Sequence, residues 1–191
     1  MKEDKRERIR QASIKVISKK GFYNTRADQI AEEAGVAVGT IYNYFSNKEE
    51  ILEYIFEVEL KKRLAFLEEL ENKEGHVLDK IHLFLQKHFN EIIKDPKVGE
   101  ILVKEKQFPH RNNLNAILGY LKLIPEKLTL LLENGAKKGQ IRKCNYKLIG
   151  SSLFGAIQGV VEVAIQNNEL AILNEAADEL TDLFFNGLKI K

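Results

Sequence analysis

The side chains best suited to specific chemistry in this chain share one side of a short predicted helix. At about 100° per residue, Gly39, Thr40 and Asn43 point in one direction, and Tyr42 and Tyr44 flank them. A hydroxyl and an amide can hydrogen-bond base edges and phosphates, a glycine permits close approach, and tyrosine hydroxyls can bond phosphate. The pattern favours a surface that meets double-stranded DNA, although polar residues on a short surface helix can also be merely solvated.

The residues that enzymes use are not arranged for catalysis. His76, His82, His88 and His110 show neither H-x-x-x-H nor H-E-x-x-H spacing. The sequence has no glycine-rich phosphate loop and no G-x-S-x-G motif, and Cys144 has no second cysteine with which to form a redox or thiolate metal site. We expect no enzyme activity, no cofactor and no metal.

The composition predicts a globular protein with a basic N-terminal part. The chain has 191 residues, of which 44% are hydrophobic and 30% charged. No apolar stretch approaches the roughly 20 uninterrupted residues that span a bilayer, and the N-terminus is charged, so we expect a cytoplasmic protein without a membrane partner. Residues 1–48 carry a net charge of +4 and the remainder −2, which suits an N-terminal module that contacts phosphates.

Apolar residues recur at spacings of three and four, and no run alternates with a period of two, which indicates an all-α fold of about nine helices. Thr25 is the expected N-cap of the second helix and Gly35 its end, Ala37 is the apparent N-cap of the third, and Asn47 with Glu50 can cap the fourth. Pro125 should kink or divide its helix. The helices are expected at 4–20, 26–34, 38–45, 48–70, 76–94, 97–107, 112–138, 146–168 and 172–188.

The first helices form a three-helix helix-turn-helix unit, because two short helices joined by a glycine-containing turn follow a longer one. Residues 25–52, TRADQIAEEAGVAVGTIYNYFSNKEEIL, resemble the N-terminal signature of the TetR family of bacterial transcriptional regulators. The resemblance implies a helix-turn-helix DNA-binding domain at 1–48 and a helical-bundle ligand-binding and dimerisation domain at 49–191. It also implies a transcriptional repressor.

The resemblance implies that residues of this sequence at the family's DNA-contacting positions also contact DNA. In such proteins the third helix enters the major groove, and other residues hold the flanking phosphates. Ala37 departs from many relatives, which have Ser or Thr there, and alanine cannot cap a helix or bond phosphate through its side chain. The implied base-contacting residues are Val38, Gly39, Thr40, Tyr42 and Asn43, and the implied phosphate-contacting residues are Thr25, Arg26, Tyr44 and Lys48.

One short recognition helix reads few base pairs, so specificity needs two copies about one DNA turn apart, and we expect a homodimer on a palindromic operator. The last two helices are the expected interface, as in the family. Each candidate there can equally belong to the intrachain core. The candidates are Leu153, Ile157, Val161, Ile165, Leu180, Leu183 and Phe184.

Apolar residues of the C-terminal part could enclose a small hydrophobic effector, although the same residues describe an ordinary bundle core. Gln158 and Glu162 form a polar pair in an otherwise apolar helix, and their partners could lie across a dimer, within the chain or on a ligand. The candidate ligand-binding residues are Phe84, His88, Phe89, Ile92, Leu102, Phe108, Leu118, Leu121, Phe154 and Gln158.

Two segments, 87–89 and 118–123, are similar to the acyl-CoA-responsive regulators of fatty-acid degradation within the family, which implies a long-chain acyl-CoA effector. Two alternatives remain open at this point. One is a multidrug-sensing regulator of an efflux operon. The other is a helical protein-interaction module that does not bind DNA, from which a steep dependence of DNA affinity on salt would distinguish a DNA-binding protein.

Overall fold

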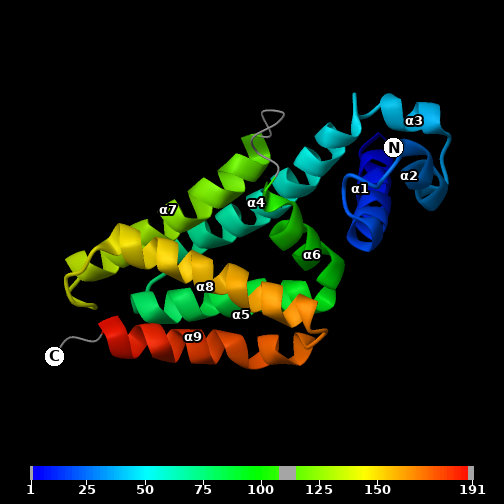
Figure 1. The fold of residues 1–191 in the computed structure, drawn as a ribbon. Coiled ribbons are helices and arrows are strands. Elements are labelled where there is room, and N and C mark those ends of the chain that lie inside the picture. Colours follow the sequence, from blue (N-terminus) through cyan, green and yellow to red (C-terminus); the bar gives the residue numbers. More distant parts are fainter. Residues whose placement is uncertain (1, 108–114, 189–191) are drawn as a thin grey trace. The chain divides into compact units, whose positions relative to one another are not determined.

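A computed structural model describes residues 2–107 and 115–188, and every regular element within these ranges is a helix (Figure 1). This confirms the expected all-α fold. The α-helices are α1 (Lys2–Lys20), α2 (Ala27–Ala34), α3 (Val38–Tyr42), α4 (Lys48–Asn72), α5 (Val77–Lys94), α6 (Pro96–Lys104), α7 (Asn115–Lys137), α8 (Tyr146–Gln166) and α9 (Leu173–Leu188), and the short 3₁₀ helices are η1 (Glu105–Gln107) and η2 (Leu170–Ile172).

Local side-chain chemistry explains where several helices begin. The side-chain oxygen of Asn47 accepts the N–H of Glu50 at 2.8 Å, as expected for the N-cap of α4. The prediction that Thr25 caps α2 is wrong. Its hydroxyl donates to the carbonyl of Gly21 at 2.8 Å, so Arg26 is the N-cap and the side chain of Gln29 accepts the Arg26 N–H at 3.2 Å.

Helix α7 runs through Pro125 without a break, so the proline does not divide it. The carbonyl of Pro125 accepts the hydroxyl of Thr129 at 2.8 Å. Ile124 and Leu128, on either side of this turn, are both buried. Burial of the apolar face therefore keeps the helix continuous although proline lacks an N–H.

The chain forms two compact units, which we describe separately. The first comprises Met1–Leu60 and Lys97–Tyr120, and the second Lys61–Pro96 and Leu121–Lys191. Helices α4 and α7 contribute residues to both. In the first unit α1 packs on α2 and α2 on α3, and in the second α5 lies beside α8 and α9 (Figure 1). The predicted domain boundary after residue 48 stays a prediction.

Helix α8 contributes much of the core of the second unit. Leu153, Ile157 and Val161 are each at most 2% exposed, and they lie one turn apart along one face of the helix. By length and composition alone α8 could cross a membrane, but the core helix of a soluble protein passes the same test. Its buried face is that of a core helix.

Candidate nucleic-acid interface and effector region

A small apolar core positions α3. Ile41 and Phe45 are each 1% exposed and pack with Ile9, Ile30 and Ile51 from the neighbouring helices. Because these two side chains lie four residues apart, they fix one side of the helical turn against the core. The opposite side must then face away from it.

The turn between α2 and α3 has the backbone that its glycine predicts. Gly35 has φ 63°, a left-handed conformation that glycine adopts without steric cost, and its N–H bonds the carbonyl of Glu32 at 3.1 Å. Ala37 is the N-cap of α3 and makes no side-chain capping bond, as the sequence predicts. Three residues, 35–37, therefore suffice to connect the two helices.

The outward side of α3 carries the residues predicted to read bases. Val38 is 40% and Tyr42 56% exposed, and Gly39 and Asn43 are also exposed. Thr40 is half-buried. No Cβ built at Gly39 would come within 4 Å of another group, so a large surface can approach the backbone there. The structure therefore brings the five predicted base-contacting residues together on one exposed surface.

Three of the four residues predicted to hold phosphates differ in their exposure. Arg26 is exposed, with Asp28 3.7 Å from its guanidinium. Tyr44 is half-buried and packs against the apolar core that positions α3. Thr25 is only 2% exposed, and its hydroxyl is engaged with Gly21. Arg26 is thus the most accessible cation of this set, and the contacts of all these residues with DNA stay predictions.

Lys48, the remaining predicted phosphate contact, is bound to the loop between α1 and α2. Its ammonium donates to the carbonyls of Phe22, Tyr23 and Thr25 at 3.1–3.2 Å. It also lies 4.6 Å from the centre of the Phe22 ring. An ammonium has three N–H groups, so Lys48 is used here to fix the loop that precedes α2.

Sequence reasoning missed one residue of that loop, Tyr23, and one residue that contacts the loop, Glu105. Tyr23 is 62% exposed, and its carbonyl accepts from the ammonium of Lys48, one of the predicted phosphate contacts. Glu105, from η1, accepts the N–H of Phe22 at 3.0 Å and is 7% exposed. Burial raises the pKa of the Glu105 carboxyl, and the hydrogen bond from Phe22 opposes that rise. A sequence separation of 83 residues left no pattern from which this contact could be predicted.

The predicted effector residues of α5 are buried in the second unit. Phe84, His88, Phe89 and Ile92 are each at most 4% exposed, and the His88 ring lies 6.2 Å from Phe84 and 5.6 Å from Phe89 between centres. The space among His88 and its neighbours on α4 and α5 has about 10 Å³ of water-accessible volume, roughly one water molecule. This part of the region is a packed core.

The other predicted effector residues differ in exposure. Leu102 is 2% exposed, Phe154 9% and Gln158 7%, whereas Leu121 is half-buried and Leu118 is 43% exposed. Phe108 lies outside the described residues. A ligand-binding role for the whole set stays a prediction.

A buried charged cluster beside these residues was not predicted. The Arg63 side chain is 2% exposed, donates from Nε to Nδ1 of His88 at 3.1 Å, and lies 3.8 Å from the carboxylate of Glu91. Burial, followed by the charge of Arg63, holds the pKa of His88 well below its usual range. His88 is therefore neutral, and its Nδ1 is the acceptor that Arg63 requires.

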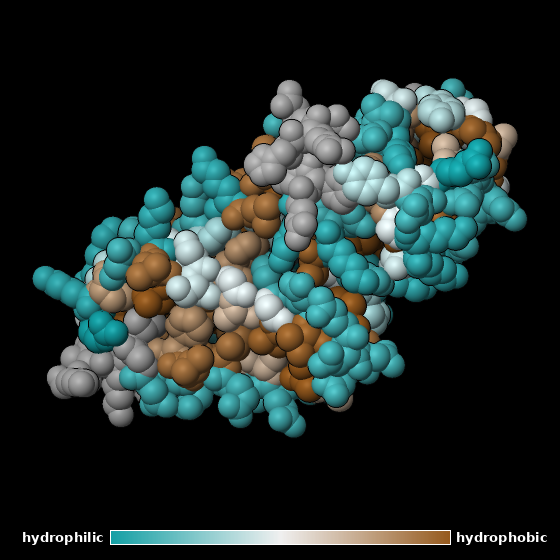
Figure 2. Space-filling view, in the orientation of Figure 1, coloured by the Kyte–Doolittle hydropathy of each residue, from teal (hydrophilic) through white to brown (hydrophobic). Residues whose placement is uncertain are grey.

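The candidate dimer surface is shifted from the predicted one. Leu153, Ile157 and Val161 are buried within the second unit, so they belong to its core, the alternative left open above. Leu183 is 66% exposed. Pale and brown residues gather over α8 and α9 in the space-filling view (Figure 2). Along α8 a stripe of exposed residues at helical spacing comprises Leu148, Ser152, Gly155, Gly159 and Val163.

This exposed stripe follows helical spacing and contains the motif G-x-x-x-G. A Cβ at Gly155 or Gly159 would meet nothing within 4 Å. The two glycines indicate from sequence that another surface can come close to this helix. The sequence does not indicate which face is outward, because the helix is almost wholly apolar.

Comparison with known proteins accounts for nearly the whole chain. Residues 9–55 match the model of bacterial regulatory proteins of the tetR family, and residues 56–187 match the C-terminal region of YsiA-like proteins. The fatty acid metabolism regulator protein of Bacillus subtilis (strain 168) is 29% identical over 185 residues, covering 94% of this chain and 93% of that protein.

Two solved structures agree with this relationship. The transcriptional regulator FadR from Bacillus subtilis in complex with stearoyl-CoA is 28% identical with a TM-score of 0.81, covering 92% of this chain and 97% of that one. The fatty acid degradation regulator FadR from Bacillus halodurans is 26% identical with a TM-score of 0.82, covering 93% of this chain and 94% of that one.

Proposed function

The chain belongs to the tetR family of bacterial regulatory proteins, and we propose that it represses transcription by binding a palindromic operator as a homodimer. We place the DNA-binding domain at 1–48, the effector and dimerisation domain at 49–191, and the protein in the cytoplasm. The observation that carries the DNA-binding part is the exposed side of α3, held outward by the buried pair Ile41 and Phe45. Selection of bound sequences from random DNA would test it, because a repressor of this kind must enrich one palindrome.

The predicted phosphate contacts can be tested by salt dependence. Each phosphate contact that is removed should lower the slope of log affinity against log salt by about 1. Arg26→Ala should produce this change because its guanidinium is exposed beside α2. Arg142→Ala, also exposed but in the second unit, is the control. A wild-type affinity independent of salt would instead favour a protein-interaction module.

Dimerisation, in this proposal, uses the exposed stripe of α8 with the neighbouring face of α9. Close approach of two copies at Gly155 and Gly159 would bury apolar side chains such as Val163, which is 47% exposed. Gly159→Glu should shift the sedimentation equilibrium toward monomer. Gln86→Glu, an exposed change on α5, should not. A monomeric wild-type protein at micromolar concentration would contradict the proposal.

The effector is proposed to be a long-chain acyl-CoA. Support comes from the similarity of nearly the full chain to a fatty acid metabolism regulator and to a regulator crystallised with stearoyl-CoA. The proposed acyl-contacting residues include Phe84, Phe89 and Phe154, which are buried among apolar groups and would have to move apart to admit an acyl chain, because the space beside His88 holds about one water molecule. Palmitoyl-CoA should raise the melting temperature and release operator DNA, since a ligand of the native state stabilises it. A response only to lipophilic cations would favour a multidrug-sensing regulator.

Release of DNA requires that the effector bind a DNA-incompetent form of the dimer more tightly than the competent form. Helix α4 provides an uninterrupted connection, because it begins at Lys48, which fixes the loop before α2, and continues to Asn72 in the second unit. We propose that the effector acts through α4. Equal affinity of palmitoyl-CoA for free and operator-bound protein would exclude this route.

A further inference from the structure

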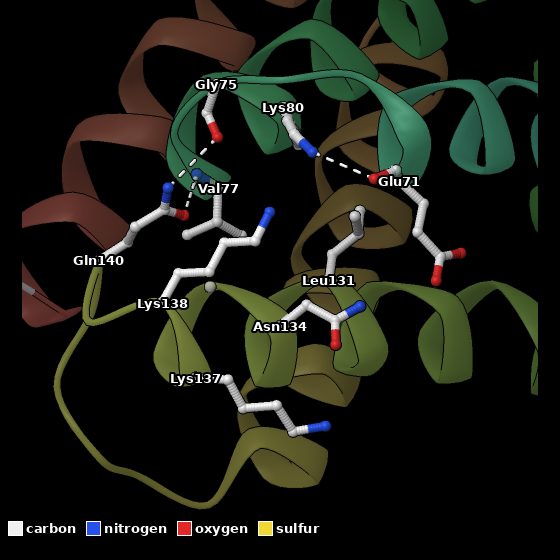
Figure 3. Close-up of a pocket in the computed structure, with 10 residues that line it drawn as sticks. Glu71, Gly75, Val77, Lys80, Leu131, Asn134, Lys137, Lys138 and Gln140 are labelled. Carbon is white, nitrogen blue, oxygen red and sulfur yellow. Dashed lines mark hydrogen bonds between the residues drawn. The ribbon is translucent and has the colours of Figure 1, made fainter.

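A pocket in the second unit, away from α5's aromatic residues, is lined by cationic side chains. It has a volume of about 200 Å³ and lies where the end of α4, the beginning of α5 and the end of α7 meet (Figure 3). Lys80, Lys137 and Lys138 line it, and Glu71 is the one carboxylate among its lining residues. The balance of charge in the pocket is therefore positive.

Two of the three ammonium groups converge. Figure 3 shows Lys138 extending over Val77 toward Lys80, whereas Lys137 extends the other way along α7. Lys80 is 6% exposed, and its ammonium donates to the carbonyl of Glu71 at 3.3 Å. Burial lowers the pKa of Lys80, and the charge of Lys138 lowers it further. Lys138 is exposed, so an anion can reach the pair, and two like charges brought together favour an anion between them.

The carboxylate of Glu71 offsets this pair only in part: its charge raises the pKa of Lys80, against the larger effects of burial and Lys138. It lies 3.4 Å from the ammonium of Lys127 and is directed away from Lys80 and Lys138 (Figure 3). Lys127 also lies 3.8 Å from Glu68. Glu68 and Glu71 thus both lie within 4 Å of Lys127, which is not among the lining residues of the pocket.

The backbone around the pocket is fixed by several contacts. A Cβ at Gly135 would lie 2.5 Å from a methyl carbon of Val77, so only glycine allows α7 to approach α5 this closely. The Gln140 side chain accepts the N–H of Val77 at 3.0 Å and donates to the carbonyl of Gly75 at 3.3 Å. The ring of His76 lies 3.1 Å from the carbonyl of Gln140. Lys138 therefore extends from a turn that is attached to the start of α5.

We propose that this pocket binds a small phosphorylated anion, with Lys80 and Lys138 as the two cations that hold the phosphoryl group. Two ammonium groups and an amide at Asn134 can supply donors to its oxygens, and charge-assisted hydrogen bonds to phosphate are among the strongest in proteins. The site is separate from the proposed acyl-binding residues on α5. Free phosphate, pyrophosphate and organic phosphate monoesters share the chemistry that it recognises.

The test is calorimetric titration of the full-length protein with pyrophosphate and, separately, with glycerol 3-phosphate, at an ionic strength kept constant with sodium chloride. At least one of them should bind and raise the melting temperature. Lys138→Met and Lys80→Met should each weaken binding by about tenfold to a hundredfold, the effect of losing a hydrogen bond to a charged group. The ligand that binds more tightly distinguishes an inorganic phosphate from an organic phosphate monoester as the source.

Lys137→Met is the matched control, because it removes the same charge from the adjacent residue of α7. It should weaken binding by less than about fivefold, because its ammonium extends away from Lys80 and Lys138 (Figure 3) and offers only a screened attraction. Lys138→Arg should retain binding, and it keeps the site testable if Lys80→Met fails to fold. Equal losses for Lys137→Met and Lys138→Met, or no binding of either ligand at millimolar concentration, would overturn the proposal. In the latter case the lysines serve only to neutralise the carbonyl ends of α4 and α7.

Discussion

Helices α3 and α5 place their polar side chains in opposite ways. In α3 the apolar Ile41 is buried, whereas Tyr42 and the C-cap residue Asn43 are exposed, where a partner can reach them. In α5 the polar Lys80 and His88 are buried, and each has a partner within the second unit. An outward polar group costs little and can bind something else, whereas a buried one must be satisfied by the fold.

The comparison predicts the largest effect on stability for a buried residue of the core that positions α3. Phe45→Ala should lower the free energy of unfolding by about 3–5 kcal/mol, because Phe45 is 1% exposed and packs 5.6 Å from the Tyr54 ring. Tyr42→Ala, on the exposed side, should change stability by less than about 0.5 kcal/mol. Urea denaturation measures both. Similar losses for the two variants would mean that Tyr42 is part of the core.

The exposed side should instead affect DNA selectivity. Asn43→Ala should reduce discrimination between the preferred operator and single-base variants by about 1–3 kcal/mol at one position, since an amide can make a bidentate contact with a base. Asn72→Ala, an exposed asparagine at the end of α4, is the control. Competition binding at fixed salt gives the difference. Unchanged selectivity would remove Asn43 from the base-contacting set.

The two helices also differ in how much of their role could be predicted from sequence. The bounds of α2 and α4 and the outward side of α3 depend on neighbours a few residues away, such as Gly35 and Asn47, and were predicted almost completely. The ion pairing of Arg63 with Glu91 and the contact of Glu105 with Phe22 depend on residues far apart in sequence. Neither leaves a periodic signal.

Exposure was hardest to predict where a helix is apolar on all sides. Leu153 and Ile157 looked like dimer contacts, but they are core residues, and the outward stripe of the same helix runs through Gly155 and Gly159. Hydrophobic periodicity cannot predict which face of such a helix is buried. The prediction that Thr25 caps α2 was wrong for a different reason. The Thr25 hydroxyl donates instead to the carbonyl of Gly21.

The buried polar side of α5 predicts a pH dependence of stability. Burial holds the pKa of His88 below its ordinary value of 6.5, so below that pH the unfolded chain binds a proton that the folded chain does not. Stability should fall as the pH drops from about 6.5 toward the folded pKa, with a slope of up to about 1.4 kcal/mol per pH unit.

His88→Gln should remove this contribution, while His82→Gln on the same helix serves as the control. The measurement is urea denaturation of both variants and the wild type between pH 5 and about pH 7.5, the range in which histidine usually titrates. A wild-type slope that survives in His88→Gln would assign the effect to another group.

The smallest effect concerns how the two helices begin. The His76 ring caps α5 by accepting the N–H of Leu78 at 3.2 Å, whereas Ala37 gives α3 no side-chain cap. Ala37 has the extended backbone of an N-cap, with φ −70° and ψ 148°, so a serine hydroxyl there can accept an N–H of the first turn. Ala37→Ser should raise the free energy of unfolding by about 1 kcal/mol.

Ala65→Ser, an exposed change in the middle of α4, is the matched control and should lower stability by a few tenths of a kcal/mol, because serine has a lower helix propensity than alanine. Opposite signs for the two substitutions in thermal denaturation would show that the gain comes from capping. If Ala37→Ser also lowers stability, the first turn of α3 is already satisfied by its backbone, in which the Thr40 N–H bonds the carbonyl of residue 37 at 2.8 Å. The beginning of α3 would then be as firmly held as that of α5, and the contrast between the two helices would be limited to their polar faces.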